Sequence, residues 1–342
     1  MAINPLKIIV EKNVPFIEKL DEVVSVTRLP YSEITPEAVR DADALIVRTR
    51  NRCDSALLSN SRVKFIGTAT IGTDHIDLSW CAANGIEVAN APGCNAPAVA
   101  QYVFSSLMRI INRPLSSYCI GIVGVGHVGR IVERWAKAMN MTVMLCDPPR
   151  QYAEGGEHWC SLNDVAAHAD IITFHTPLTG KGPDSTYHLA DETFFRSLCR
   201  APIIINSARG AVVDNLAWIN ALEAGICGDA IIDCWEEEPD INLRLLQKAT
   251  VATPHIAGYS FEGKQRASQM VLDALCRHFN LPPININGNA PKSCASTITP
   301  NVALNGYNPL IDTKVLKSNP EKFEDIRNSY ILRSELQAAI ES

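Results

Sequence analysis

The sequence predicts an α/β protein with doubly wound parallel sheets, and three observations lead to this fold class. Short apolar runs of strand length alternate with helical patterns almost throughout the 342 residues. These runs are continuously apolar, which is typical of parallel strands that helices cover on both faces. Two long helical patterns also bracket one block of strands, which indicates that one domain is inserted into another.

The predicted strands follow one another along the chain with helical patterns between them. Ten apolar runs are expected to form strands: residues 6–10, 43–49, 63–70, 86–91, 118–125, 142–147, 170–176, 201–208, 228–235 and 250–256.

The two long helical patterns span residues 96–112 and 260–279 and border the strand block from 118 to 256. Their placement predicts a discontinuous outer domain. That domain would consist of about the first 95 residues together with the helix that follows residue 259.

Beyond the second long helix the composition changes. Residues 281–320 are expected to be irregular, because their first part is rich in Pro, Asn and Ser and has no sustained period. Residues 320–340 regain helical spacing, with apolar side chains at Phe323, Ile326 and Tyr330. A further helix is therefore expected there.

The overall composition excludes several classes of protein. Hydrophobic residues make up 46% and charged residues 20%, as in a globular protein with a sizeable core. The net charge is −6 with no basic block, so nucleic acid is not an expected partner. No run of about 18 apolar residues predicts a membrane span, and the protein is expected to be soluble and cytoplasmic.

The eleven cysteines contain no Cys-x-x-Cys pair. Most of them lie inside apolar runs, as Cys119, Cys146, Cys199 and Cys234 do. Buried free thiols in a reducing compartment are therefore expected, rather than a disulfide framework or a zinc site. No metal is expected.

A glycine motif, Gly124-x-Gly126-x-x-Gly129, follows a predicted strand and opens a predicted helix. This context suits dinucleotide binding, in which the glycines allow a tight turn, approach of a pyrophosphate and close helix–strand packing. Asp147 ends the next strand and can bind both ribose hydroxyls, so NAD is favoured over NADP, although Arg150 nearby weakens this preference. The alternative is a glycine-rich turn without a ligand.

Three further strand ends carry polar residues, namely Arg209, Glu238 and His255. Ligands of open α/β sheets bind outside the carboxyl ends of strands, so all three are candidates for one cleft. His255 can take the proton of an alcohol as hydride leaves the same carbon, and Glu238 can raise the pKa of that imidazole. Arg209 can bind a substrate carboxylate through its planar fork. This set predicts hydride transfer from a 2-hydroxy acid.

Each of these residues also has a purely structural interpretation. A single histidine after a strand is usually a packing residue, an Arg-Gly pair is usually a surface turn, and the run Glu236 to Glu238 suits a solvated face. His175 is a rival to His255, but its strand is expected to line the cofactor. His75 is expected to be a cap or packing residue.

These segments resemble those of the NAD-dependent D-2-hydroxyacid dehydrogenases. The matching segments are GTATIGTDHID, GIVGVGHVG, FHTPL, NSARGAVVD, the Asp233, Glu238 and Pro239 spacing, and PHIAG. The resemblance covers residues 6–280 and is weaker in FEDIRNSYILRSEL.

The resemblance implies a fold and an assembly. It implies a Rossmann NAD-binding domain over residues 96–257, inserted into a flavodoxin-like substrate-binding domain of residues 1–95 and 258–280. Residues 281–342 would be a shortened segment of the type that mediates dimerisation, and the protein is expected to be a homodimer.

The resemblance also implies roles for single residues. Arg209, Glu238 and His255 are expected to be catalytic. The expected NAD contacts are Gly124, Gly126, His127, Val128, Gly129, Asp147, Thr176, Ser207, Ala208, Arg209, Asp233 and Gly258. The expected substrate contacts are Thr49, Thr70 and Tyr259.

Narrower cues resemble one branch of this family, namely VRTRNRCDSALL, GTATIGTDHID, APGCNAPAVAQYVFSSL, LCDPPR and HIAGYSFEGK. This resemblance implies a phosphorylated 2-hydroxy acid as the small-molecule substrate. Such a substrate has two anionic ends, and Arg48 is a candidate for the phosphate, although an ordinary strand-end charge is an equal alternative. A sister dehydrogenase for another hydroxy acid, such as 3-phosphoglycerate, is the first alternative. A non-catalytic NAD-sensing protein is the second, and the presence of Glu238 and His255 disfavours it.

Overall fold

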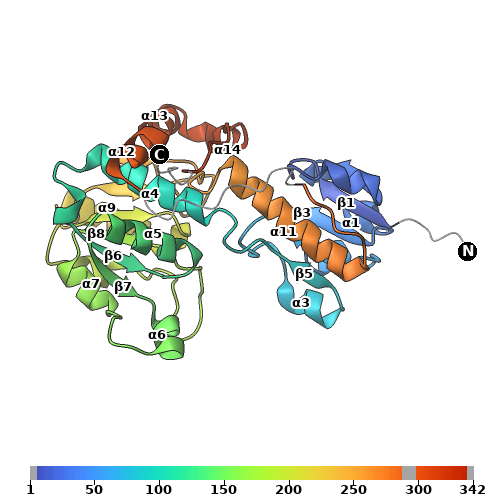
Figure 1. Ribbon diagram of the computed structural model, residues 1–342, viewed down its shortest axis with the longest axis horizontal. Coiled ribbons are helices and arrows are strands. Elements are labelled where there is room, and N and C mark those ends of the chain that lie inside the picture. The colour runs from blue at the N-terminus through green and yellow to red at the C-terminus, as the bar shows by residue number, and fades with distance from the viewer. Residues whose placement is uncertain (1–5, 287–297, 337–342) are drawn as a thin grey trace, which may run out of the picture. The chain divides into compact units, whose positions relative to one another are not determined.

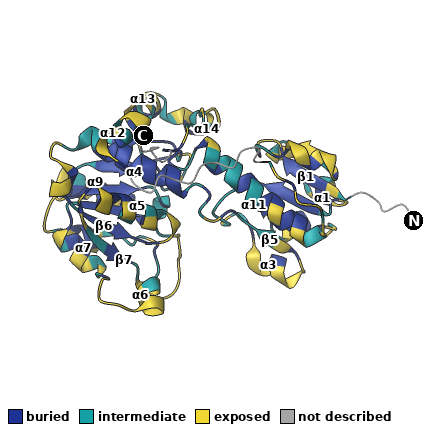
Figure 2. Ribbon diagram, viewed as in Figure 1, coloured by how far each residue is buried: buried dark blue, intermediate teal, exposed yellow. Residues whose placement is uncertain are grey.

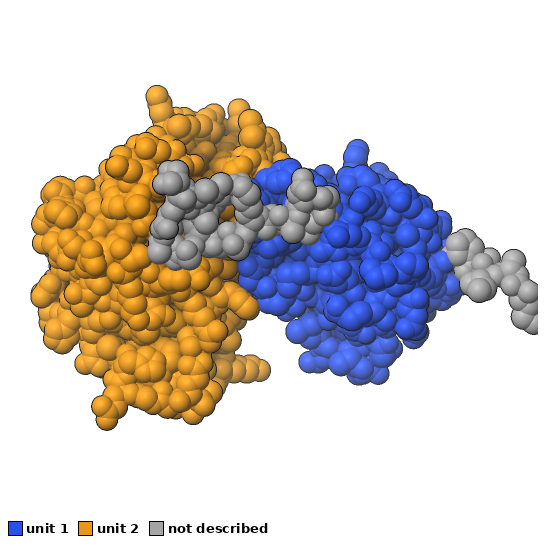
Figure 3. All heavy atoms as spheres, in the orientation of Figure 1, with its two compact units in different colours: residues 1–95, 260–291 blue, residues 96–259, 292–342 orange. Residues whose placement is uncertain are grey.

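A computed structural model describes residues 6–286 and 298–336. The chain divides into two compact units (Figure 3). The described part of unit 1 consists of residues 6–95 and 260–286, and that of unit 2 consists of residues 96–259 and 298–336. Each unit is built on its own parallel sheet.

The sheet of unit 1 has five parallel strands in the order β2-β1-β3-β4-β5, which is the flavodoxin-like order. Its strands are β1 (Lys7–Glu11), β2 (Ser25–Leu29), β3 (Ala44–Val47), β4 (Phe65–Thr68) and β5 (Glu87–Ala89). Every residue of β3 and β4 is buried, as expected for central strands covered on both faces (Figure 2). The edge strand β2 has no fully buried residue, so its sequence does not stand out, and the apolar runs did not predict it.

One long helix and several short ones cover this sheet (Figure 1). Helix α11 (Phe261–Phe279) begins at the cap residue Ser260 and packs closely on β4. A Cβ at Gly67 of β4 would lie 2.4 Å from Val271 Cγ1, so glycine permits this approach. The shorter elements are α1 (Pro36–Val39), α2 (Ser55–Leu58), α3 (Leu78–Ala83), η1 (Glu18–Glu22) and η2 (Tyr31–Glu33).

The sheet of unit 2 has six parallel strands in the order β11-β10-β9-β8-β6-β7. Its strands are β6 (Cys119–Val123), β7 (Thr142–Cys146), β8 (Ile171–Phe174), β9 (Ile203–Asn206), β10 (Ala230–Ile232) and β11 (Val251–Ala252). An isolated parallel bridge between Leu145 and Trp159 extends the sheet beyond β7. With the bridge counted, the first six positions follow the 3-2-1-4-5-6 order of a Rossmann fold, and β11 adds a seventh position beside β10.

Helices cover both faces of this second sheet. They are α4 (Ala96–Ile110), α5 (His127–Ala138), α6 (Pro148–Glu154), α7 (Leu162–His168), α8 (Glu192–Arg196), α9 (Asn215–Glu223), α10 (Leu243–Lys248), η3 (Leu115–Ser117) and η4 (Gly210–Val212). Neighbouring strand residues enter different hydrophobic clusters. Ile172 belongs to the same buried cluster as Trp218, whereas Ile171 belongs to the cluster that contains Trp135. Because strand side chains alternate between faces, each face has its own core.

The C-terminal segment corrects one prediction. Residues 300–318 were expected to be irregular, but they form α12 (Pro300–Gly306) and α13 (Pro309–Ser318). Thr299 and Asn308 cap these helices, and each helix has proline in its first turn. Pro and Asn begin helices as readily as they form turns, and composition alone does not separate the two.

The last predicted helix is shorter than expected. After η5 (Pro320–Lys322), helix α14 spans Phe323–Asn328 only, and residues 329–336 are not helical. Residues 337–340 of the prediction lie outside the described part. The described C-terminal residues pack within unit 2, where Thr313 Oγ1 of α13 accepts a hydrogen bond from the Ala252 amide of β11 at 3.0 Å.

The ten cysteines in the described part of the chain are free thiols, as predicted, but they are not all buried, because Cys199 is exposed and Cys119 and Cys160 are partly buried. Within that same part, no helix has the length and apolar character needed to cross a bilayer.

Candidate active site beside β9, β10 and β11

Three neighbouring strands bring the predicted catalytic residues to one edge of the unit 2 sheet. The Asp233 amide donates to Asn206 O at 3.0 Å, and the His255 amide donates to Asp233 O at 2.8 Å. These bonds continue the pairing of β9, β10 and β11 past the strand ends. Arg209, Glu238 and His255 follow these three strands in turn, so the edge carries all of them.

Glu238 and His255 are in direct contact. His255 Nδ1 lies 2.8 Å from Glu238 Oε2 and 3.1 Å from Glu238 Oε1. The Trp235 amide donates to Glu238 Oε1 at 2.8 Å and holds the carboxylate in place. His255 has φ of 57°, in the left-handed region that non-glycine residues rarely adopt and that recurs at functional sites.

This contact shifts the pKa of both groups. Burial disfavours the charged carboxylate, but the imidazole of His255 holds the pKa of Glu238 below its ordinary value. Burial also disfavours the charged ring, but the neighbouring Cys234 sulfur and the Glu238 carboxylate raise the pKa of His255 well above its ordinary value. The ring is therefore a stronger base than a free histidine.

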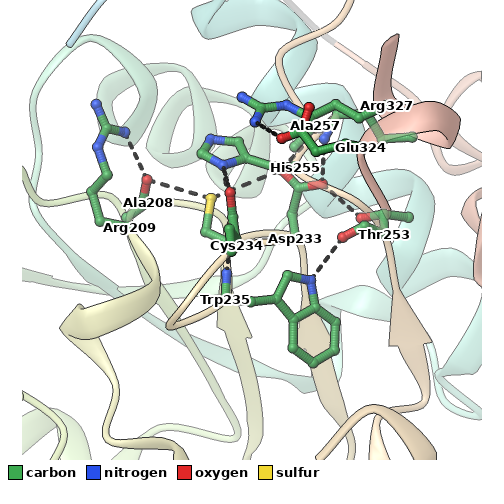
Figure 4. Close-up of polar contacts among 12 residues, drawn as sticks. Ala208, Arg209, Asp233, Cys234, Trp235, Thr253, His255, Ala257, Glu324 and Arg327 are labelled. Carbon is green, nitrogen blue, oxygen red and sulfur yellow. Dashed lines mark hydrogen bonds and ion pairs between the residues drawn. The ribbon is translucent and has the colours of Figure 1, made fainter. Parts of the chain in front are cut away.

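Asp233 supports the loop that carries His255. Its side chain is 1% exposed and accepts hydrogen bonds from Thr253 Oγ1, the Ile256 amide and the Ala257 amide at 2.7, 2.8 and 2.9 Å (Figure 4). Burial raises the pKa of its carboxyl. The structure thus places Asp233 as a buried support of the loop, and its contact with NAD stays a prediction.

Arg209 lies in the turn after β9. Its Nη1 donates to Ala208 O at 2.8 Å, and Asn206 Nδ2 donates to Arg209 O at 2.9 Å. A Cβ at Gly210 would lie 1.9 Å from Trp235 O, so this turn packs directly on the segment that leads to Glu238. Asn206 was not predicted as a site residue, although a polar residue at the carboxyl end of β9 could have indicated one.

The thiol of Cys234 belongs to the same cluster, which the sequence did not predict. Its Sγ, a Glu238 oxygen and a His255 nitrogen all lie within 4.8 Å of one another. The Cys234 side chain is buried, and its Sγ lies 3.5 Å from Ala208 O (Figure 4). Its position two residues after the end of β10 was the available signal.

The C-terminal segment also reaches the His255 loop. The guanidinium of Arg333 donates to Ile256 O at 3.0 Å, to Tyr259 O at 3.1 Å, to Ala98 O at 3.1 Å and also to Ala257 O. The resemblance in this segment was noted, but no residue in it was predicted.

A second arginine from the same segment lies near the site. Burial disfavours its charge, but Tyr259, Glu238 and Glu324 raise the pKa of Arg327. Tyr259 also stacks edge-to-face with Tyr330, with ring centres 6.2 Å apart.

The glycine loop has the geometry of a dinucleotide site. Gly124 has φ of 89°, and a Cβ there would lie 2.8 Å from the backbone of His175. A Cβ at Gly129 would lie 2.2 Å from Gly124 O, which explains the close packing of α5 on the turn. A Cβ at Gly126 would meet no atom of the described residues within 4 Å, so space remains where a pyrophosphate is expected.

Asp147 directly follows the adjacent strand β7, caps helix α6 and contacts the same loop. Its Oδ2 accepts from the Val125 amide at 2.7 Å, and its Oδ1 accepts from the Arg150 amide at 3.1 Å. Arg150 forms a bidentate ion pair with Glu154, in which Nε donates to Oε1 at 2.9 Å and Nη2 donates to Oε2 at 2.7 Å. Because this arginine already has a partner, it is not poised to bind a 2′-phosphate, which strengthens the preference for NAD.

Two hydroxyls at neighbouring strand ends are unpaired. Thr176 Oγ1 and Ser207 Oγ are buried and have no hydrogen-bond partner among the described residues. Buried polar groups are normally satisfied, so these two fit a ligand that provides the partners. The remaining predicted NAD contacts are His127 and Val128 at the start of α5, Ala208 beside Arg209, and Gly258 in the loop after β11.

His175 is not a second acid–base candidate. Burial lowers its pKa to about 3, and its Nε2 lies 3.0 Å from Thr173 Oγ1. The ring is therefore neutral at ordinary pH, which agrees with a residue that lines the cofactor.

The predicted substrate residues of unit 1 follow its central strands. The Arg48 amide donates to Glu11 Oε2 at 2.8 Å directly after β3, and Thr49 is exposed in the next turn. Thr70 follows β4, and its Oγ1 donates to Gly72 O at 3.1 Å. His75 Nε2 lies 3.2 Å from Thr68 Oγ1, as expected of a packing residue.

Comparison with known proteins gives a consistent result. Residues 97–257 match the family model described as D-isomer specific 2-hydroxyacid dehydrogenase, NAD binding domain. A Bacteroides thetaiotaomicron protein named erythronate-4-phosphate dehydrogenase is 47% identical over 97% of this chain and 98% of its own. A protein of the same name from Escherichia coli is 46% identical over 79% of this chain and 72% of its own.

A solved structure is also similar. It is the D-lactate dehydrogenase of Aquifex aeolicus, complexed with NAD and lactic acid, which is 25% identical with a TM-score of 0.69. The match covers 80% of this chain and 95% of that one.

Proposed function

Since this chain belongs to the NAD-dependent D-2-hydroxyacid dehydrogenases, in their erythronate-4-phosphate dehydrogenase branch, we propose that it oxidises 4-phospho-D-erythronate. The product is 3-hydroxy-2-oxo-4-phosphobutanoate, and the reaction is a step of pyridoxal 5′-phosphate (vitamin B6) biosynthesis. The observation that carries the proposal is the contact of His255 Nδ1 with Glu238 Oε2 at 2.8 Å in the unit that holds the glycine loop.

NAD is the cofactor, and when bound it supplies the acceptor for the hydride that leaves C2 of the substrate. The open space at Gly126, the carboxylate of Asp147 and the unpaired hydroxyls of Thr176 and Ser207 would hold it.

His255 moves the proton. Because Nδ1 faces the carboxylate, it carries the ring proton that Glu238 accepts, and the other ring nitrogen, Nε2, takes the proton of the C2 hydroxyl. Glu238 orients the ring and stabilises the imidazolium that forms. In the reverse direction the same nitrogen returns the proton to the ketone.

The substrate has two anionic ends. Arg209 binds the carboxylate through its guanidinium fork, which fixes C2 for hydride transfer. Arg48, Thr49, Thr70 and Tyr259 donate to the phosphate and the remaining hydroxyl groups. The basic and hydroxyl side chains of this set suit a phosphate better than the small apolar end of a lactate.

The alternatives are a sister dehydrogenase for 3-phosphoglycerate and a non-catalytic NAD-sensing protein. We disfavour the second because the proton-transfer pair is assembled, and a sensor has no need of it. The test is NADH formation by purified protein with NAD and, separately, 4-phosphoerythronate, 3-phosphoglycerate and D-lactate. We expect turnover of the first at the highest kcat/KM. Efficient turnover of another substrate alone would refute the assignment, and NAD binding without any turnover would favour the sensor.

We also propose that the protein acts as a homodimer in the cytoplasm. Helix α13 exposes Ile311 and Val315, and Ile331 beyond it is 88% exposed, so apolar side chains are available for contact with a second copy. Light scattering with size-exclusion chromatography tests this, and a monomeric mass at micromolar concentration would contradict it.

A further inference from the structure

The cluster of Cys234, Glu238 and His255 combines three chemically different ligand groups. A thiol sulfur, a carboxylate oxygen and a ring nitrogen lie within 4.8 Å of one another. Cys234 is 2% exposed, whereas the side chains of Glu238 and His255 are 17% and 29% exposed. The sulfur of the cluster is therefore buried, whereas the ring and the carboxylate are partly exposed to solvent.

Neighbouring contacts hold this arrangement in place. The Trp235 amide fixes Glu238 Oε1 at 2.8 Å, and Asp233 O accepts from the His255 amide at 2.8 Å. Cys234 lies in the chain between Asp233 and Trp235, the two residues that make these hydrogen bonds. The Glu238 carboxylate and the His255 backbone are thus each held by a hydrogen bond to a chain neighbour of Cys234.

The ligand set matches one metal ion. Thiolate and imidazole favour borderline-soft cations, and one carboxylate completes a set that Zn²⁺ accepts in tetrahedral sites with an open fourth position. Zinc bonds of about 2.0–2.1 Å to nitrogen and oxygen and about 2.3 Å to sulfur place tetrahedral ligand atoms roughly 3.3–3.6 Å apart. The 2.8 Å contact between His255 and Glu238 needs to open by only about half an ångström to reach that spacing.

We propose that Zn²⁺ binds to Cys234 Sγ, Glu238 and His255 Nδ1, and that it thereby inhibits the enzyme. The metal takes the place of the proton between Nδ1 and the carboxylate. That proton moves to Nε2 of the same ring, and the thiol proton is released to solvent. A neutral imidazole that is metal-bound at Nδ1 carries its proton on Nε2, so it has no lone pair to accept the proton of the substrate.

Direct binding is the first test, with Co²⁺ as the probe because it accepts the same ligands and is coloured. The metal-free protein is titrated with Co²⁺ without NAD or substrate. We expect a thiolate-to-cobalt absorption band in the near ultraviolet that Cys234→Ser removes. Cys199→Ser, which changes an exposed cysteine, is the matched control and is expected to keep the band. A band that persists unchanged in Cys234→Ser would refute the site.

The second test measures inhibition by Zn²⁺ of each variant relative to its own zinc-free rate. We expect Cys234→Ser and Cys234→Ala to need about tenfold more zinc or higher for half inhibition than wild type and Cys199→Ser. Addition of EDTA should restore the wild-type rate. Equal zinc sensitivity of all four proteins would refute the proposal. Because the cobalt titration uses no substrate, its result does not depend on the proposed reaction.

Circular dichroism and urea unfolding show whether the Cys234 variants are folded. Two replacements of different polarity keep the test decisive if one of them fails to fold. If both folded variants retain the cobalt band, the thiol is not a ligand.

Discussion

Glu238 approaches His255 from the Nδ1 side with both of its carboxylate oxygens, at 2.8 and 3.1 Å. This geometry leaves the opposite ring nitrogen for the substrate. It also places a partly buried negative charge where it stabilises the protonated ring, so the pair has the tautomer and the basicity that alcohol oxidation requires.

The pH dependence of Glu238→Gln tests this pair. Oxidation needs a neutral His255, so kcat/KM is expected to rise with pH through the raised pKa of that ring. Gln cannot stabilise the imidazolium, so the rising limb should move to lower pH while the maximum rate falls by about tenfold or more. The pH profile of initial NADH formation measures both effects. If the rising limb of the pH profile did not move in Glu238→Gln, Glu238 would not be the group that raises the pKa of His255.

Replacement of the histidine separates chemistry from binding. His255→Ala should reduce turnover by about 10²–10⁴-fold, because the proton acceptor is lost. NAD binds in the glycine loop and should bind with little change, as isothermal calorimetry can measure. The exposed His168→Ala is the control and should behave as wild type. Undiminished turnover in His255→Ala would exclude the acid–base role.

Cofactor choice should depend on Asp147. Asp147→Asn keeps an acceptor for the Val125 amide but removes the negative charge that repels a 2′-phosphate. We expect the ratio of kcat/KM for NADP to that for NAD to rise by roughly tenfold. Steady-state kinetics with both cofactors measure it. An unchanged ratio would show that another group sets the preference.

Two glycines of the loop should respond differently to the same change. Gly126→Ala places a methyl group where no atom of the described residues lies within 4 Å, so the fold should be retained while NAD binding weakens. Gly129→Ala places it 2.2 Å from Gly124 O, so it should lower the free energy of unfolding by about 2 kcal/mol or more. Urea unfolding and NAD titration distinguish them. Equal stability of the two variants would contradict this account of the turn.

Arg333 should stabilise the loop that carries the catalytic histidine. Arg333→Met leaves four backbone oxygens without this donor, including those of Ile256 and Tyr259. We expect a loss of about 3 kcal/mol in the free energy of unfolding and a lower kcat. The exposed Arg196→Met removes only a surface ion pair and should change little. Similar stability of both variants would argue against the loop contact.

Local sequence determined much of this protein. The apolar runs predicted the strands of both sheets except β2, and the long helices at 96–112 and 260–279 were found as α4 and α11. The glycine motif and the three polar strand ends predicted where a cofactor and a catalytic pair would lie. These features are local, because a strand, a turn and a helix start each depend on residues close together in the chain.

Only the tertiary structure decided the rest. Residues 300–318 became helices because they could pack on α4 and β11, although their composition suited a loop equally well. Arg333 meets Ala98, 235 positions away, and Cys234 joins Glu238 and His255 only because β10 and β11 lie side by side. Such contacts depend on the register of strands and the packing of helices, which no short stretch of sequence contains. The sequence therefore determined the elements and the chemistry at their ends, whereas the fold determined which of those groups meet.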